Sequence, residues 1–579
     1  MSRPGPLTVR RVRNYYLSPP SVGRAGQRTG LRGHSSEEGD RAMAKSGKHR
    51  LILCNDGGPL LGPNVEAPIG ADGLERLVIA PLVGTQVDTL YWQLGTDPYL
   101  STPSHRFSDI YSHRTDVGPR WGEEQERFTS AGNWRIYENT RQLIEGGTDP
   151  PEVVIEGGHR AGLDVFLSFR VNDVHDGTLE GESPELLSPV KRAHPDWLLG
   201  PSARLRPEHR ALGLSRFAYD FAVPEVREYK LALAREAIES YDLDGLDWDF
   251  CRFPRLFREG EAVKNAGLIT EMLHQVRAAL DAKARRVGRR LYLSVRVPPT
   301  IELAGAFGLD VRGWIDDGVV DILVVGVVHS SMYRAPVESF VEAARGSNVE
   351  VIAQNLGLFW FGRPNSARVL WHEQDVFSPA MCRASAATYW RAGVDGIYLW
   401  NNQIIEFSRD AAYDREPWKE IADPRLIARR DKHYLVDKPD SWQTFADELG
   451  EPPVPPGPLP VDLSDPGDIA DIQIDVADDV AGAVAENALA EATLRLMIVN
   501  LTARDQISFE LNGTPVDRSA ADVHLMYNDC WLDFDVSRGP LTQGWNRLRV
   551  EVLERNPLVD APLTLDSVEV LVRYQGSPR

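Results

Sequence analysis

Residues 241–257 read YDLDGLDWDFCRFPRLF, and within them four aspartates stand two or three positions apart in an otherwise largely apolar segment. Aspartate is rarely buried unless it is paired, so acids in such a run need a specific role. A strand sends successive side chains to opposite faces, which places Asp247 and Asp249 on one face. The opposite face consists of Leu246, Trp248 and Phe250. The stretch therefore predicts a strand that packs on helices with one face and carries carboxylates on the other.

The chain around this stretch repeats one unit, a short apolar run that ends in a polar cluster and is followed by a longer segment with helical spacing. In residues 224–241 and 266–286, apolar side chains recur every three to four positions, as in a helix with one buried face. Eight apolar runs can be identified: HRLILCNDGG from His49, VDTLYWQLG from Val87, LDVFLSFRVND from Leu163, LDGLDWDF from Leu243, RLYLSVRVPP from Arg290, VVDILVVGVV from Val319, VEVIAQNLG from Val349 and VDGIYLWNN from Val394. Eight apolar strands that alternate with helices close a TIM barrel. We predict an α/β fold with a (β/α)8 barrel at residues 49–432.

The composition changes after residue 432. The segment 450–463, GEPPVPPGPLPVDL, holds too much proline for the interior of a helix or a strand, so we expect a semi-rigid linker at residues 433–463. Short runs of alternating polarity follow, bounded by turn signals such as LNGT at 511–514. Residues 464–579 are therefore predicted to form an antiparallel β-sandwich of the jelly-roll kind. This accessory domain either binds sugar or braces the barrel, and the sequence does not choose between the two.

Residues 1–48 differ from everything that follows. Eight arginines stand there among Gly, Pro and Ser without a periodic apolar pattern, which predicts a disordered basic extension. A basic arm that touches RNA or a membrane is one interpretation. The other is an upstream extension, because Met43 opens MAKSGKHRLILCNDGG directly before the first predicted strand. We favour the second interpretation.

Removal of residues 1–42 is expected to leave folding and any activity intact, because a segment of this composition contributes no apolar core. Thermal unfolding of the full chain and of the shortened chain measures the effect. A fall in Tm of more than a few degrees would show instead that the extension docks on the barrel.

The charge and cysteine content limit the classes of partner. The formal net charge is −20, from 64 Lys and Arg against 84 Asp and Glu, and it repels nucleic-acid phosphates. No run approaches the roughly 18 apolar residues of a membrane span. The four cysteines lack the spacing of a zinc site or a disulfide scaffold, which predicts buried thiols in a reducing compartment; they are Cys54, Cys251, Cys382 and Cys530. We expect no nucleic-acid or membrane partner and a cytoplasmic protein, although secretion stays open if the true export signal is missing.

The alternation that turns Asp247 and Asp249 into the barrel also applies to the two neighbouring strands. The inward residues are Ser168, Arg170 and Asn172 on strand three, and Ser294 and Arg296 on strand five. An isolated ion in a barrel interior costs several kcal/mol, so these charges have to be paired or to lie at the mouth. We predict that Asp247, the deeper acid, pairs with Arg170 or Arg296. We place Asp249 at the carboxyl end of strand four, where barrel enzymes carry their chemistry.

Polar residues follow nearly every other strand at the same end of the predicted barrel. They are Asn55 and Asp56 after strand one, Asp173 and His175 after strand three, His329 after strand six, Gln354 and Asn355 at strand seven, and Asn401 and Asn402 after strand eight. Trp92 and Trp400 fall at this rim as well, where sugar rings can stack on them, although each alone could be core packing. The rim predicts a site for a polyhydroxylated ligand. A buried ion-pair network without chemistry would explain Asp247 but not this rim. No histidine pair has metal-site spacing, and we expect no metal or other cofactor.

Residues 241–254, together with GLDVRGWIDDGVVDILVVG at 308–326, resemble the bacterial glycosyl-hydrolase-like family-10-type barrels. In that family the fourth strand reads Asp-Gly-apolar-x-aromatic-Asp and ends in an aromatic-Pro pair, and the sixth strand follows a W…GxxD junction. The resemblance covers about the second half of the barrel. It implies a TIM-barrel hydrolase that acts on glycosidic bonds, with Asp249 at the acidic position.

The same stretch is similar to the family-18 chitinase signature, Asp-x-x-Asp-x-Asp-x-Glu, through Asp244, Asp247 and Asp249. Cys251 stands where the signature has its glutamate. Because a chitinase mechanism needs that glutamate as general acid, this difference argues against chitinase activity. The neighbouring Arg252 is always protonated and cannot replace it.

A glycosidase needs two carboxyl groups, one on each side of the bond that it cleaves. We predict Asp249 as the first, kept ionised by Arg170 and Arg296. We predict Glu302, in VPPTIELAG just beyond strand five, as the second, with an apolar neighbourhood that raises its pKa toward that of a general acid. The reserves for the second carboxyl group are Asp173, Asp56 and Glu373.

The sequence therefore predicts a glycoside hydrolase for an oligosaccharide, polysaccharide or other glycoside. Its predicted catalytic residues are Asp249, Glu302 and Asp247. Its predicted substrate-binding residues are Asp56, Trp92, Arg170, Asn172, Asp173, His175, Arg252, Arg296, His329, Asn355, Trp400 and Asn401. The first alternative is a catalytically inactive barrel that binds carbohydrate, which the cysteine at position 251 makes credible. A weaker alternative is a sugar lyase or isomerase that uses His175 or His329 as its base.

Overall fold

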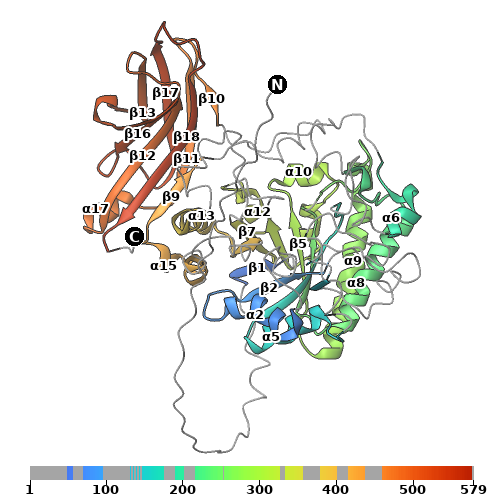
Figure 1. Ribbon diagram of the computed structural model, residues 1–579. Helices are drawn as coiled ribbons and strands as arrows, with labels where there is room; N and C mark the ends of the chain where they lie inside the picture. Colours follow the sequence, from blue (N-terminus) through green and yellow to red (C-terminus); the bar gives the residue numbers. More distant parts are fainter. Residues whose placement is uncertain are drawn as a thin grey trace, which may run out of the picture. The chain divides into compact units, whose positions relative to one another are not determined.

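The structure is a computed structural model (Figure 1). It describes residues 49–55, 69–94, 146–174, 189–200, 215–326 without Arg252, 333–355, 378–400, 415–436 and 459–576, together with a few single positions between 131 and 143.

Eight parallel strands close into a barrel in chain order, with β1 between β2 and β8, which confirms the predicted fold class. The strands are β1 (Leu51–Asn55), β2 (Thr89–Gln93), β3 (Asp164–Arg170), β4 (Gly245–Asp249), β5 (Tyr292–Val297), β6 (Ile322–Val325), β7 (Glu350–Asn355) and β8 (Gly396–Trp400). The α-helices of this part are α2 (Gly70–Val78), α5 (Pro150–Arg160), α6 (Pro189–Ala193), α8 (Pro224–Ser240), α9 (Ala262–Val287), α10 (Ile301–Ala306), α11 (Val311–Asp316), α12 (Glu338–Ala343), α13 (Pro379–Ala392) and α15 (Pro424–Ile427). Short 3-10 helices cover Ala80–Leu82, Pro195–Trp197, Ser215–Phe217 and Glu416–Lys419.

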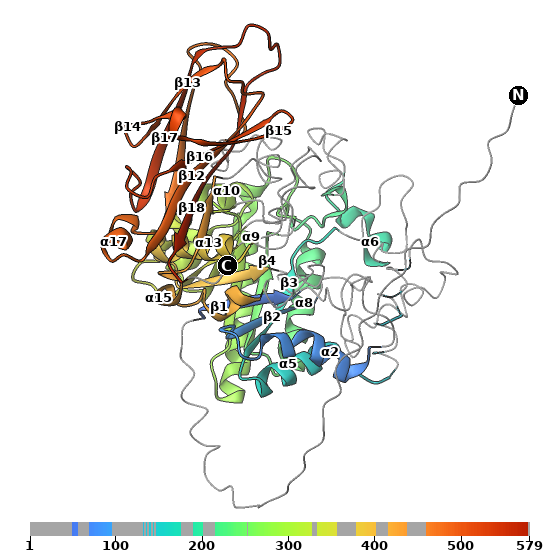
Figure 2. The ribbon, with the colours of Figure 1, turned by 60° about the vertical axis from the view of Figure 1, so that its left-hand side comes forward.

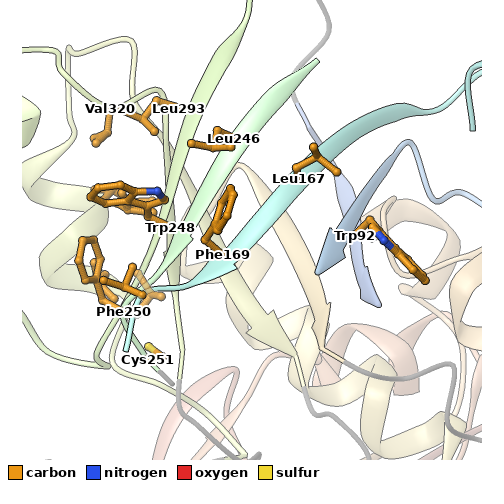
Figure 3. Close-up of a cluster of buried hydrophobic side chains, with 14 of the residues drawn as sticks. Trp92, Leu167, Phe169, Leu246, Trp248, Phe250, Cys251, Leu293 and Val320 are labelled. Atoms are coloured by element: carbon orange, nitrogen blue, oxygen red, sulfur yellow. The ribbon is translucent and has the colours of Figure 1, made fainter. Parts of the chain in front are cut away.

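The outer face of the barrel strands packs on the helices, as the alternation predicts. Figure 3 shows this cluster, in which Trp248 of β4 and Phe250, the residue after β4, lie with Phe169 of β3. A separate apolar cluster fills the interior, and it includes Cys54, Tyr91, Phe166, Tyr398 and Trp400. Gly245 makes room for Phe166, because a Cβ atom at Gly245 would lie 2.5 Å from the ring. The Asp-Gly pair at 244–245 thus lets an aromatic ring occupy the lower interior. All four cysteines are buried and none forms a disulfide, as predicted.

Two of the longer helices show why they begin and end where they do. Helix α13 begins at Ser378, whose hydroxyl accepts a hydrogen bond from Met381 N at 3.2 Å, and it ends at Gly393 with φ 92°. Helix α9 has Arg285 and Arg286 in its last turn and ends at Gly288 with φ 72°. Among the helices that the structure describes, none combines the length and the hydropathy of a membrane span.

The C-terminal part consists of antiparallel strands in two sheets, as predicted for a β-sandwich. One sheet has the order β10-β18-β12-β16-β15, with β9 paired to β18, and the other has the order β11-β17-β13-β14. The elements are β9 (Lys432–Leu435), β10 (Val461–Asp462), β11 (Ile469–Val476), α17 (Val480–Ala485), β12 (Leu489–Val499), β13 (Gln506–Leu511), β14 (Thr514–Val516), a 3-10 helix (Arg518–Ala520), β15 (Asp522–Met526), β16 (Asp529–Asp535), β17 (Gly544–Glu554) and β18 (Thr564–Tyr574). Their inward side chains form one apolar core.

The sandwich contacts the barrel through apolar, hydrogen-bonded and ionic interactions. Its core cluster also contains Tyr333, Met381 and Ala384 of the barrel part. Asp475 on β11 is buried and lies 2.8 Å from Nε of Arg334, and Arg391 at the end of α13 donates to its other oxygen. Strand β9 begins at the residue where we expected the barrel to end, and it joins the sandwich sheet. These contacts support a bracing role for the sandwich.

Asp475→Asn is expected to lower the free energy of unfolding by about 2 to 3 kcal/mol, because two arginines would lose their buried counter-charge. Urea unfolding of the full chain measures this. The matched control is Asp471→Asn on the same strand, whose ion pair with Arg547 is solvent-exposed and is expected to contribute about 0 to 1 kcal/mol. Equal effects of the two substitutions would show that Asp475 does not hold the sandwich to the barrel.

Candidate active site

The strand register arranges the inward polar residues in two levels. Asp247 lies between Ser168 and Ser294 on the neighbouring strands, and Asp249 lies between Arg170 and Arg296. The second level is two residues closer to the carboxyl ends of the strands. The serines and the arginines therefore meet different aspartates, although all of these side chains share one face.

Asp249 is paired with Arg296. Nε of Arg296 donates to Oδ1 of Asp249 at 2.8 Å, and Cys251 N donates to the same oxygen at 2.9 Å. Nη1 of Arg296 donates to Oε1 of Gln354 on β7 at 3.0 Å, and the guanidinium lies 5.5 Å from the ring centre of Trp400 on β8. Burial disfavours the arginine charge, but the adjacent Asp249 raises the pKa of Arg296 above its ordinary value. The pair is held from three further positions and fixes the direction of the carboxylate.

The same contacts argue against the predicted role of Arg296. The sequence predicts that Arg296 binds substrate, but its side chain is fully buried between β4, β7 and β8. We therefore assign Arg296 to the positioning of Asp249. Trp400, predicted at the rim, also lies inside the barrel and is 1% exposed.

Asp247 does not pair with an arginine, so that prediction is wrong. Ser168 Oγ and Ser294 Oγ donate to its two oxygens at 2.6 and 2.8 Å. Complete burial and then the negative charge of Asp249 raise the pKa of Asp247 to about 7, although the serine hydroxyls and Arg296 act in the opposite direction. Near neutral pH the Asp247 carboxyl is thus divided between its protonated and ionised forms.

The carboxyl end of β3 is occupied by internal contacts. Nη1 of Arg170 donates to Oδ2 of Asp173 at 3.0 Å, and both side chains are buried. Asn172 donates to the carbonyl oxygens of Tyr219 and Arg255 and accepts from Tyr219 N at 2.7 Å. This corrects the predicted substrate-binding role of Asn172, because its amide instead joins the segments that follow β3 and β4. The guanidinium of Arg170 is therefore turned toward Asp173.

Cys251 is fully buried and its Sγ lies 3.6 Å from the carbonyl oxygen of Gly326, which accepts from the thiol. Burial raises the pKa of the Cys251 thiol far above its ordinary value, although the charge of Arg296 opposes this. Cys251, which stands where the chitinase signature has its glutamate, is therefore a neutral thiol that contacts a backbone carbonyl group.

Glu302 lies in the first turn of α10, which Thr300 caps by accepting from Leu303 N at 3.0 Å. The buried face of this helix consists of Ile301, Leu303 and Ala304, and Glu302 is exposed. The apolar neighbourhood that we expected for Glu302 is therefore not present, because the helix turns its apolar side chains inward and this carboxyl group outward.

Two other predicted substrate contacts face the helices. Trp92 is buried in the outer apolar layer (Figure 3), since it alternates with Tyr91, which points into the barrel. Asn355 donates to the carbonyl oxygen of Cys382 on α13 at 3.1 Å. Trp92 and Asn355 therefore do not lie at the rim as predicted, because their side chains point outward from the barrel toward the helices.

Sequence reasoning placed Gln354 at the rim without assigning it a role in the site, and it missed Tyr398. Both lie on the inner face near the Asp249 pair, and Tyr398 is 5.9 Å from the guanidinium of Arg296. Alternation from Trp400 and Ile352 would have identified them as inward residues. Five predicted site residues lie outside the described residues, as does the reserve Glu373: they are Asp56, His175, Arg252, His329 and Asn401. Within the described ranges, no group of three or more His, Cys, Asp or Glu side chains is arranged to hold a metal ion.

No protein-family model matches this sequence, and no curated protein matches it. Among solved structures, the chain is similar to an endo-β-1,4-mannanase from Thermotoga petrophila, with 11% identity and a TM-score of 0.40 over 91% of this chain and 98% of that chain. An α-amylase from Geobacillus thermoleovorans, complexed with acarbose, has 12% identity and a TM-score of 0.36 over 86% of this chain and 98% of that chain. An α-L-fucosidase from Paenibacillus thiaminolyticus has 12% identity and a TM-score of 0.36 over 66% of this chain and 49% of that chain. At these scores the likeness carries no argument about activity, and the resemblance to family-10-type barrels stays a prediction.

Proposed function

We propose that this protein is a glycoside hydrolase that cleaves O-glycosidic bonds at the carboxyl end of its barrel, with Asp249 as the carboxylate that faces the sugar. The observation that carries the proposal is the two-level arrangement on β4, in which an arginine-paired Asp249 lies above a serine-bound Asp247. Glycosidases stabilise a positively charged, oxocarbenium-like transition state with a carboxylate. An anion fixed in place by a buried arginine and a backbone N–H suits that role, because it needs no reorientation as the positive charge develops.

Asp247 acts through Asp249 in this proposal. Asp247 lies two residues deeper in the barrel than Asp249, and serine hydroxyls occupy both of its oxygens, so in this proposal it does not reach a ligand. When Asp247 is protonated, its two serine contacts remain and Asp249 keeps the negative charge of the site. When Asp247 loses its proton, two carboxylates repel each other beside one arginine. Asp247 is therefore a positioning residue whose protonation sets the local charge, rather than the second catalytic acid.

The second carboxyl group remains Glu302 in this proposal. Its exposure and its place directly after β5, the strand that also carries Arg296, favour it over Asp173, which already faces Arg170. Glu302→Gln is expected to slow glycosides with poor leaving groups much more than activated aryl glycosides, because an activated leaving group departs without protonation. An equal loss for both substrate types would remove Glu302 as the general acid.

A specific observation favours a second function, a barrel that binds carbohydrate without turnover. Cys251 is a neutral, buried thiol at the position that carries the general acid in the signature it resembles. A panel of aryl glycosides and polysaccharides, followed both by product release and by calorimetry, separates the two functions. Turnover supports the hydrolase, and saturable binding without product supports the binding protein. If the protein shows no turnover and no binding with any compound of the panel, both proposed functions are overturned.

A further inference from the structure

Strand β15 is the last strand of the larger sandwich sheet, and among the described strands it pairs with β16 alone (Figure 2). It and the turn that follows carry a row of exposed large apolar side chains, Val523 at 53%, Leu525 at 73% and Tyr527 at 98%. Single exposed apolar residues are common. Val523 and Leu525 stand at alternate positions and therefore lie on one side of the strand, and Tyr527 follows them in the turn. We call these three residues the apolar strip.

This strip extends the core side of the sheet. Val523 is paired with Leu532 and Leu525 with Cys530, and these two partners on β16 are buried. Residues directly opposite each other in an antiparallel pair share a face. The strip therefore belongs to the face that the second sheet covers elsewhere, and its exposure shows that this cover does not reach β15.

Apart from the exposed Asp522 at its start, β15 lacks the features that usually keep an edge strand from pairing. Such edges are commonly protected by charged side chains, especially Lys, by Pro, by a bulge or by a very short strand. Strand β14 carries Pro515 and β10 has two residues, whereas β15 reads DVHLM and keeps an unbroken register with β16. In the turn, Tyr527 has φ 53°, a conformation for which turns favour Asn or Gly. Turn geometry therefore does not explain the aromatic residue.

We propose that a second copy of this chain docks on β15, edge to edge and antiparallel, around a two-fold axis through His524. The strand is self-complementary in this register. Val523 lies opposite Leu525 of the second copy, and Tyr527 lies in the turn just beyond the paired residues. Asp522 lies diagonal to His524 of the second copy, so a carboxylate meets an imidazole twice in the dimer. The contact is isologous, so it closes at two chains.

This interface does not depend on the proposed function. A single strand pair with its apolar strip buries less than the roughly 1,200 Å² of stable interfaces. We therefore expect a dimer that forms at micromolar rather than nanomolar concentration.

Sedimentation velocity of the full chain over a concentration series tests the proposal, with Leu525→Lys as the disrupting variant. A charged side chain on the edge is expected to raise the dimer dissociation constant at least tenfold. The matched control is Leu558→Lys, at a residue that is 76% exposed and lies outside both sheets. A monomeric wild-type chain, or equal effects of the two lysines, overturns the proposal, and an extended segment of another protein would then be the occupant to consider.

A second variant keeps the test independent of any folding defect. In the proposed register, His524→Cys places two thiols opposite each other, with Cα atoms about 4.5 to 5.5 Å apart, within disulfide reach. All four native cysteines are buried, so the new thiol is the reactive one. Mild oxidation is expected to give a cross-linked dimer for His524→Cys and none for the control Leu558→Cys. No cross-link at position 524 overturns the two-fold pairing.

Discussion

Replacement of Asp249 by asparagine is expected to lower kcat by about a thousandfold or more on any glycoside that the wild-type protein turns over. Asparagine keeps the shape and can still accept from Arg296, but it carries no charge to stabilise a developing cation. The KM should change much less than kcat, because the loss is confined to the transition state. Steady-state kinetics of wild type and variant on the same glycoside measure both parameters.

The structure adds a stability effect to this experiment. Asparagine leaves the fully buried Arg296 without a counter-charge, which costs about 3 to 5 kcal/mol where one partner of a buried pair is removed. Asp475→Asn is the matched control, because it removes a buried acid from arginines outside the barrel interior. Both variants are assayed well below their own Tm. A kcat for Asp249→Asn within tenfold of the Asp475→Asn value would contradict the role of Asp249.

The second large effect is on the pH dependence of stability. The folded-state pKa of Asp247 is about 7, against the ordinary value of 3.8. Folding raises the pKa of this carboxyl group, so between pH 3.8 and about pH 7 the folded state binds more protons than the unfolded state. The folded state therefore loses stability as the pH rises through this range. The unfolding free energy of wild type minus that of Asp247→Asn should therefore fall by roughly 2.5 kcal/mol from about pH 5 to about pH 8. Wild type loses this stability and the variant does not.

Urea unfolding of both chains at a series of pH values measures this difference. The predicted pairing of Asp247 with an arginine would have implied a different result, because Asp247→Asn would then destabilise the fold by removing the counter-charge of that arginine. The charged and titratable groups around Asp247 include Asp249, Arg296, Tyr91, Tyr398 and Cys251, and they are the same in both chains. A pH-independent difference would mean that Asp247 is ionised throughout and that its serine contacts do not hold a proton in the site.

Alternation within single strands was enough to predict much of the fold. The apolar face of Leu246, Trp248 and Phe250 and the inward direction of Asp247 and Asp249 follow from local backbone geometry, which a sequence displays directly. The number of strands and the sandwich followed from counting such patterns. The same rule was not applied to Trp92 and Asn355, whose alternation with Tyr91 and Gln354 turns them toward the helices.

The partners of the inward residues depended on the tertiary structure. Whether Asp247 meets serines or arginines is set by the register between neighbouring strands, and closure of the whole barrel fixes that register. The exposure of Glu302 depends on the orientation of α10, which packs its apolar side chains into the core and leaves Glu302 on the opposite side. The sequence by itself determined which side chains turn inward, because that is a property of one strand. Only the tertiary structure decided which of them pair, and so which acid has a pKa near neutrality, because pairing and burial arise between strands that are far apart in the chain.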